Sequence, residues 1–133
     1  MANGTTKMYY AAPHLHEWAA ATGNASGYLQ QVFADRQAWW DSALAVVERL
    51  GRPSVLAVVD AQLSHAWTPG VAARDEILPN LLDAGWLKDK WRLTDEQWRD
   101  LLDMDHGTAE ALRVLCLELA AGRELPAEVG ADV

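Results

Sequence analysis

The sequence has a single cysteine, a single phenylalanine and far fewer basic than acidic residues. One cysteine, Cys116, excludes an intramolecular disulfide framework and a zinc site built from cysteines. Eleven lysines and arginines against nineteen aspartates and glutamates give a net charge of −8, so the chain as a whole lacks the basic footprint of a protein that binds nucleic acid or anionic lipid. No apolar run approaches the ~20 residues that span a membrane, and the N-terminus has no apolar segment typical of a signal peptide. These absences predict a soluble, cytoplasmic protein.

The apolar content of the chain is high, because half of its 133 residues are hydrophobic and seven are tryptophan. A chain of this length and composition can bury a hydrophobic core as one domain. Its charge is uneven: residues 1–60 carry five acids and four bases, and the other 73 residues carry fourteen acids and seven bases. The acidity therefore belongs to the second half of the chain.

The longest periodic stretch covers residues 28–50 and contains no proline or glycine. Ser26 can cap its start, and Gly51 with Pro53 ends it. Its apolar residues recur in steps of three and four and form two adjacent rows, a face that other helices must cover. The sequence thus predicts an all-α fold, a single compact irregular bundle of six to seven helices around this long central helix.

Shorter amphipathic patterns predict the other helices, over residues 13–22, 55–67, 71–85, 94–104 and 109–121. Pro79 is expected to kink the stretch over residues 71–85 or to divide it into two short helices. Residues 55–67 are nearly free of charge, which predicts the most buried element. Their β-branched start would also suit a strand, an alternative that stays open although no second strand-like run exists to pair with it. Thr94 and Gln97 have the spacing of a capping box, and Thr108 is expected to cap the last helix.

These patterns divide the chain into three parts. Residues 1–12 are expected to be a flexible N-terminal arm, residues 13–122 a single helical domain and residues 123–133 a frayed C-terminal tail.

The histidines offer weak candidates for chemistry. His14 and His16 are two residues apart and so point about 200° from each other on a helix, which argues against a shared metal ion with Glu17. His106 follows Asp105 just before Gly107, where a helix C-terminus by itself favours histidine. No cofactor-binding loop or activated nucleophile accompanies them. We therefore expect no metal, no cofactor and no catalytic residue, which favours a non-enzymatic protein.

The last predicted helix argues against direct DNA reading. It begins Thr-Ala-Glu-Ala-Leu, and Arg113 is its only base before Gly122. A helix that reads the major groove usually presents Arg, Lys, Asn, Gln or Ser at its start. We expect no direct contact with DNA bases and no membrane association.

A cluster of acidic residues in the second half forms a candidate interaction face. Its members are Asp95, Glu96, Asp100, Asp103 and Asp105. Glu96, Asp100 and Asp103 follow steps of four and three, so they form a stripe opposite Trp98 and Leu102. Such a stripe can imitate a phosphate backbone or steer docking onto a basic partner. It can equally be a solvated helix face that keeps an acidic protein soluble.

The tryptophans are the candidate apolar anchors. Trp39 and Trp40 leave their helix about 100° apart, so one is expected in the core while the other meets a second helix, a ligand or a partner. Indoles bury a large area and are common both in cores and at interfaces. We expect one or two of the seven to be partly exposed, with Trp40, Trp86 and Trp91 the best candidates.

The sequence is compatible with two kinds of function. The first is a small, acidic, non-enzymatic interaction module that docks on a larger, basic protein through tryptophans and the acidic face, as an inhibitor, adaptor or assembly factor; one version is a nucleic-acid mimic. The alternative is a helical bundle that binds a small apolar or aromatic ligand between the long helix and residues 86–93, with Trp39, His65 and His106 as pocket residues and His65 or His106 as an acid–base group. A second copy of the chain could also complete the wide face of the long helix, which would give a homo-oligomer.

Overall fold

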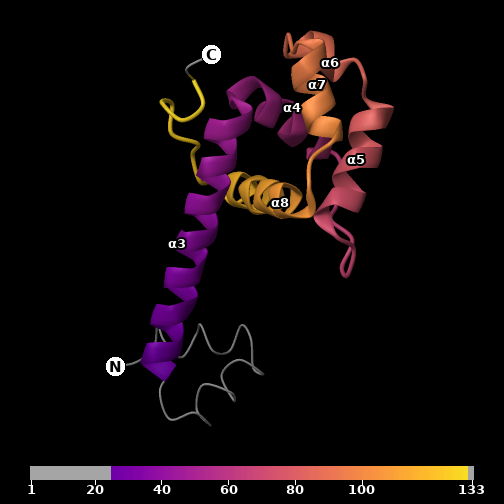
Figure 1. The fold of residues 1–133 in the computed structure, drawn as a ribbon. Helices are drawn as coiled ribbons and strands as arrows, with labels where there is room; N and C mark the ends of the chain where they lie inside the picture. The colour runs from indigo at the N-terminus through magenta and orange to yellow at the C-terminus, as the bar shows by residue number, and fades with distance from the viewer. Residues whose placement is uncertain (1–24, 132–133) are drawn as a thin grey trace. The chain divides into compact units, whose positions relative to one another are not determined.

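The computed structural model describes residues 25–131, which form six α-helices and no strand. The helices are α3 (Ala25–Leu50), α4 (Arg52–Gln62), α5 (Ala73–Asp83), α6 (Leu87–Lys90), α7 (Asp95–Leu102) and α8 (His106–Ala120), as Figure 1 shows. The all-α prediction is confirmed for this part of the chain, and the uncharged run after Pro53 is helix rather than strand. The predicted arm, the helix over residues 13–22 and the residues His14, His16 and Glu17 lie outside the described residues.

The chain divides into two compact units within α3, residues 1–38 and residues 39–133. The described part of the first unit is the first half of α3, where Val32 and Phe33 are exposed. The second unit contains the rest of α3, all of α4 to α8, and the buried core.

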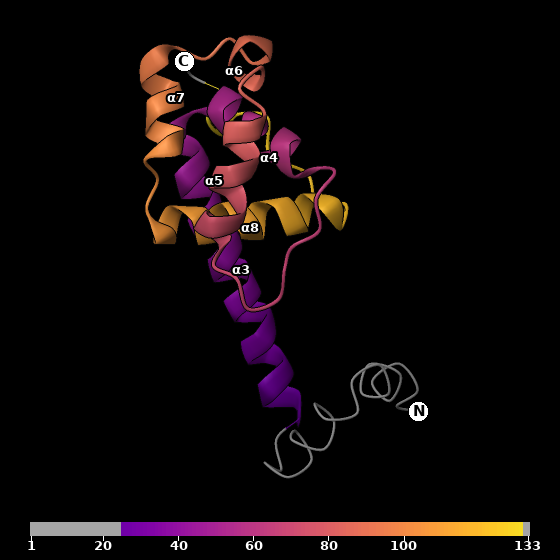
Figure 2. The same cartoon turned by 90° about the vertical axis from the view of Figure 1, so that its right-hand side faces the viewer.

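The short helix α4 is the element that most others contact. It packs against α5, α6, α7 and α8, and α5 and α8 also pack against each other (Figures 1 and 2). Its Val55, Ala57 and Val58 are fully buried. A helix with almost no charge can be enclosed on several sides at little desolvation cost, which explains why α4 takes this position.

The predicted bundle around a long central helix is confirmed only in part. The second half of α3 does contribute to the core, with Trp40, Ala43, Val46 and Val47. The remaining core side chains come mostly from α4, α5, α7 and α8. The length of α3 and its two apolar rows predicted that other helices cover it. They did not show that α4 is the helix against which the others pack.

The chain after α8 is bound to the start of α4. The Arg52 guanidinium donates from Nη1 to the carbonyl oxygens of Pro126, at 2.7 Å, and Val129, at 3.2 Å. The backbone N–H of Arg52 donates to the Gly130 carbonyl at 2.9 Å, and the Gly130 N–H donates to Glu48 Oε1 at 3.2 Å. The sequence predicts a frayed tail over residues 123–133. In the structure the described part of that segment is hydrogen-bonded, largely through backbone carbonyls that no side-chain pattern can signal.

Candidate functional site

The exposed side of α7 carries the acidic stripe. Glu96, Asp100 and Asp103 are exposed, whereas Leu101 is buried and Trp98 is half-buried on the inner side. In the described part of the chain none of these three carboxylates forms a hydrogen bond or an ion pair. The stripe is therefore free to meet charges from outside.

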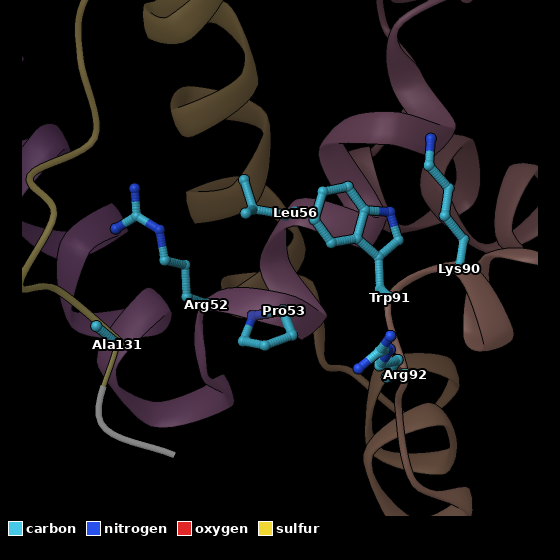
Figure 3. Close-up of a pocket in the computed structure, with 7 residues that line it drawn as sticks. All are labelled: Arg52, Pro53, Leu56, Lys90, Trp91, Arg92 and Ala131. Atoms are coloured by element: carbon cyan, nitrogen blue, oxygen red, sulfur yellow. The ribbon is translucent and has the colours of Figure 1, made fainter.

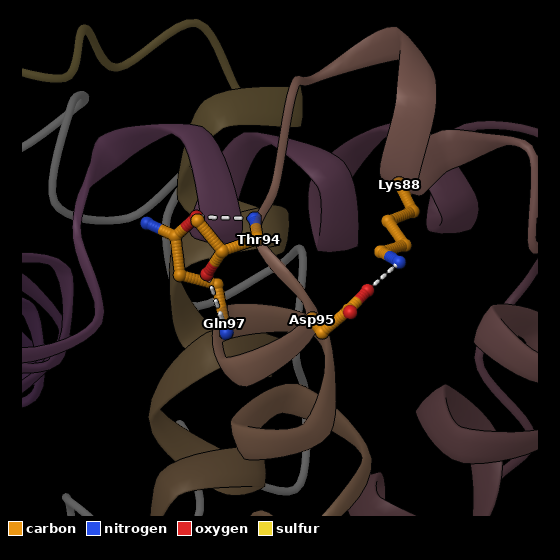
Figure 4. Close-up of polar contacts among 4 residues, drawn as sticks. All are labelled: Lys88, Thr94, Asp95 and Gln97. Atoms are coloured by element: carbon orange, nitrogen blue, oxygen red, sulfur yellow. Dashed lines mark hydrogen bonds and ion pairs between the residues drawn. The ribbon is translucent and has the colours of Figure 1, made fainter.

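Asp95, at the start of the same helix, is already engaged. Its carboxylate forms an ion pair with Lys88, and this hydrogen bond lowers the pKa of Asp95 (Figure 4). The predicted capping box is confirmed beside it: the Gln97 N–H donates to Thr94 Oγ1 at 3.0 Å, and the Gln97 side chain accepts from the Thr94 N–H at 2.8 Å. These bonds fix where α7 begins and how its acidic side faces.

Asp105 is a structural cap. Its carboxylate accepts from the Thr108 N–H at 2.7 Å, a bond that lowers the pKa of Asp105 and starts α8 at His106. The prediction that Asp105 and His106 end the preceding helix, with Thr108 as the next cap, is wrong. Aspartate caps as well as threonine does, and the Thr108 hydroxyl instead accepts from Arg49 Nη2 at 2.6 Å.

Two hollows lie beside α8, and the first of them adjoins the acidic stripe. The first, which we call the acidic hollow, has a volume of about 350 Å³ and is lined by Asp100, Asp103 and Asp105 together with Arg49, Leu50, Met104 and Thr108. The second, the Trp39 groove, has a volume of about 380 Å³ and is lined by Trp39, Ser42, Gly107, Glu110, Ala111 and Val114. Asp105 of the first hollow and Gly107 of the second are two residues apart at the start of α8.

The exposure of the two adjacent tryptophans is the reverse of the prediction. Trp40 is 4% exposed and Trp39 is 59% exposed. The prediction for Trp40 is wrong because its direction on α3 leads inward, where the Arg123 guanidinium lies 4.2 Å from its ring centroid. The predicted exposure of Trp86 is confirmed, at 60%, and Trp91 is half-buried.

Asp60 of α4 forms hydrogen bonds with the segment that contains Trp86 and Trp91. Its Oδ2 accepts from Lys90 Nζ at 2.5 Å and from Trp91 Nε1 at 3.0 Å. The hydrogen bond from Lys90 is the main cause of the lowered pKa of Asp60. The Lys90 ammonium also lies 5.6 Å from the ring centroid of Trp86 and 5.7 Å from that of Trp91. Trp91 is thus fixed in place, while Trp86 stays open to solvent.

A further cavity lies between the start of α4 and the segment after α6. It has a volume of about 380 Å³ and is lined by Arg52, Pro53, Leu56, Lys90, Trp91, Arg92 and Ala131. Figure 3 shows Leu56 beside the Trp91 ring, and Pro53 between the side chains of Arg52 and Arg92. We call it the Arg52–Trp91 pocket. The ligand pocket expected beside residues 86–93 shares residues 90–92 with it, but the sequence did not indicate the lining from α4; the run Lys-Asp-Lys-Trp-Arg, unusually basic for this chain, was a signal for its charge.

The three residues expected in a ligand pocket do not come together. His65 lines a separate cavity of about 270 Å³ with Gln62 and Cys116, Trp39 lines its own groove, and neither set includes His106. His65 Nδ1 lies 3.0 Å from the Ala61 carbonyl oxygen, so Nδ1 carries the proton in this contact. The geometry offers no histidine pair for acid–base chemistry among these residues.

The Cys116 thiol is expected to be unreactive in the folded protein. Burial raises its pKa to about 12, so almost no thiolate exists near pH 8. We expect alkylation by iodoacetamide at pH 8 to be at least about a hundredfold slower than in the denatured chain, whose thiol has an ordinary pKa. Mass spectrometry of samples quenched over time measures both rates. Similar rates for the two states would contradict the burial of this side chain.

The described residues contain neither a metal-binding cluster nor a membrane-spanning helix. Within residues 25–131 no group of three or more His, Cys, Asp or Glu side chains is placed to hold a metal ion. None of the helices described is both long enough and apolar enough to cross a membrane.

Comparisons of the chain with protein-family models, with curated proteins and with solved structures give no match. The function must therefore be argued from the surfaces described above.

Proposed function

We propose that this chain is a small, non-enzymatic interaction module that docks on a larger protein with a basic surface, as an inhibitor, adaptor or assembly factor. The observation that carries the proposal is the closeness of two features. The exposed carboxylates of Asp100 and Asp103 line the acidic hollow, and Asp105 of the same hollow lies two positions before Gly107 of the Trp39 groove. Basic side chains of the partner meet the carboxylates, and an apolar side chain inserts beside Trp39.

The structural contacts narrow the acidic residues that can take part. Asp95 is paired with Lys88 and Asp105 caps α8, so neither is free for a partner. Glu96, Asp100 and Asp103 supply the long-range attraction, which speeds encounter and orients the partner.

The apolar anchor is Trp39 rather than Trp40. Partly exposed tryptophans at the edge of a groove are frequent hot spots of protein interfaces, because they bury a large area on docking. Trp86 is a second exposed candidate, whereas Trp91 already donates its indole N–H to Asp60.

The nucleic-acid mimic is the specific version of this proposal. Along the axis of α7, Glu96 and Asp100 are separated by about 6 Å, from the rise of an α-helix, and Asp103 directly follows the last residue of α7. A regular row of negative charges is what a basic nucleic-acid groove attracts. If the chain is a nucleic-acid mimic, an excess of duplex DNA competes for the basic groove and releases the partner. A partner that stays bound in excess DNA is instead a basic protein that the chain binds without imitating nucleic acid.

Reversing the charge of the stripe is expected to abolish docking. In the variant Glu96→Lys, Asp100→Lys, Asp103→Lys, three attractive charges become repulsive, and recovery of the partner should fall by at least about tenfold. The measurement is quantitative affinity capture from the native cell with the wild-type and variant proteins, followed by mass spectrometry. Trp39→Ala should reduce recovery of the same partner without changing the charge.

The matched control reverses three exposed acids outside the stripe, Asp83, Asp89 and Glu124, which changes the net charge by the same amount. This control should retain the partner. Equal recovery of the partner with the wild-type protein and the stripe variant would rule out the proposal. Loss of the partner with both triple variants would show that net charge, and not the position of the stripe, is responsible for binding.

A further inference from the structure

We propose that the Arg52–Trp91 pocket binds a small amphipathic anion, with its flat apolar body on Trp91, Leu56 and Pro53 and its anionic head group beside Arg92. This site is independent of the docking surface, because the residues of the pocket, the acidic hollow and the Trp39 groove do not overlap. Its volume of about 380 Å³ lies within the range of small-molecule sites.

The apolar part of the pocket comes from two elements that are firmly held. Pro53 and Leu56 belong to α4, the helix that most others contact. The Trp91 ring is oriented by its hydrogen bond to Asp60 at 3.0 Å. A preformed aromatic and aliphatic surface binds a flat apolar body without the cost of ordering its side chains.

The charges at the rim select for an anion. Lys90 is neutralised by Asp60, which leaves Arg52 and Arg92 as the net positive charges of the lining. The Arg52 guanidinium already donates hydrogen bonds to the carbonyl oxygens of residues 125–129. It therefore adds positive charge to the pocket but has few N–H groups left to donate to a ligand. In the described chain the Arg92 guanidinium forms no hydrogen bond or ion pair, and so it can donate to a head group.

The backbone of Arg92 supports a role for its side chain. Arg92 has a φ of 54°, the only positive φ among the described residues that are not glycine. It follows α6 in the position where the Leu93 N–H donates to the Lys88 carbonyl at 2.9 Å, and glycine is the residue that such a helix end favours. An arginine at this position makes the fold less stable than a glycine would, so the fold by itself gives no reason for the arginine side chain.

The test uses naphthalene sulfonate as the anionic probe and naphthalene methanol as its neutral counterpart, followed by two-dimensional NMR of the tryptophan indole N–H signals. The Trp91 signal is identified by its loss in Trp91→Phe. We expect naphthalene sulfonate to shift the Trp91 signal at submillimolar to millimolar concentration, and naphthalene methanol to bind about fivefold more weakly, as expected for one charge contact near a protein surface.

Two variants and one control separate the parts of the site. Arg92→Gly relieves the backbone and should keep the protein fully folded, yet weaken the sulfonate by about three- to fivefold and leave the neutral probe unchanged. Leu56→Trp fills the cavity and should abolish the shift with both probes. Arg99→Gln removes an exposed base of α7 outside the pocket and should change neither affinity. No shift of Trp91 with the sulfonate, equal affinity for the two probes, or an unchanged affinity in Arg92→Gly would each overturn the proposal.

Discussion

Replacing Trp40 by alanine is expected to lower the free energy of unfolding by about 3–5 kcal/mol, the usual cost of removing a large buried aromatic side chain. Trp40 is almost fully buried, and its ring is covered by the Arg123 guanidinium. Its loss leaves a cavity between α3 and the chain that follows α8. Urea denaturation followed by far-ultraviolet circular dichroism measures the effect without relying on tryptophan fluorescence.

The neighbouring residue provides the control. Trp39 is mostly exposed, so Trp39→Ala should change the free energy of unfolding by less than about 1 kcal/mol. The two variants remove the same side chain from adjacent positions of one helix and differ only in the direction that it takes. Equal losses of stability would contradict the placement of α3 in the core. A folded Trp39→Ala protein is also what the docking experiment needs, because a loss of partner can then be assigned to the surface.

Replacing Gly130 by alanine is expected to cost about 2–3 kcal/mol, because both the backbone and the space around it exclude a side chain. Gly130 has a φ of +66°, and an added Cβ would lie 2.8 Å from Val47 Cγ1, 2.8 Å from the Val47 carbonyl oxygen and 2.9 Å from the Arg52 nitrogen. Two of these three atoms are backbone and cannot turn away. The bond from the Arg52 N–H to the Gly130 carbonyl should be lost as the segment moves off α3 and α4. Urea denaturation measures the cost, and limited proteolysis reports release of the C-terminal segment.

Two other glycines divide the cost into its parts. Gly122→Ala meets the same kind of positive φ, +99°, with open space around it, so it should show the backbone cost alone, about 1 kcal/mol. Gly85→Ala has neither constraint and should be close to neutral. A Gly130→Ala protein as stable as the wild type, with an equally protected C-terminus, would show that residues 125–130 do not hold the start of α4.

Local chemistry was readable from the sequence because it acts over a few residues. The capping box needs only the spacing of Thr94 and Gln97, and both of its bonds form. The exposed stripe of Glu96, Asp100 and Asp103 needs only helical periodicity and the apolar residues opposite it. The buried position of α4 follows from its composition, because only Arg52 and Asp60 near its two ends carry charge and burying charge is costly.

Contacts between distant residues could not be read in the same way. Trp39 and Trp40 belong to two equally apolar rows, and their order cannot tell which row faces the core. Asp105 and Thr108 are both good caps, and the choice depends on Arg49, 59 residues from Thr108. The Arg52–Trp91 pocket joins residues from three separate segments, two of them basic in an acidic chain.

By itself, the sequence determined the helical class, most helix positions and the acidic side of α7, because periodicity, capping and charge act along the chain. Only the tertiary structure decided that α4 is the shared packing partner, that Trp39 faces solvent and that Arg52 binds the carbonyls before Gly130. The physical reason is that packing selects among faces of similar hydrophobicity by shape, and backbone carbonyls accept hydrogen bonds whatever side chains they carry.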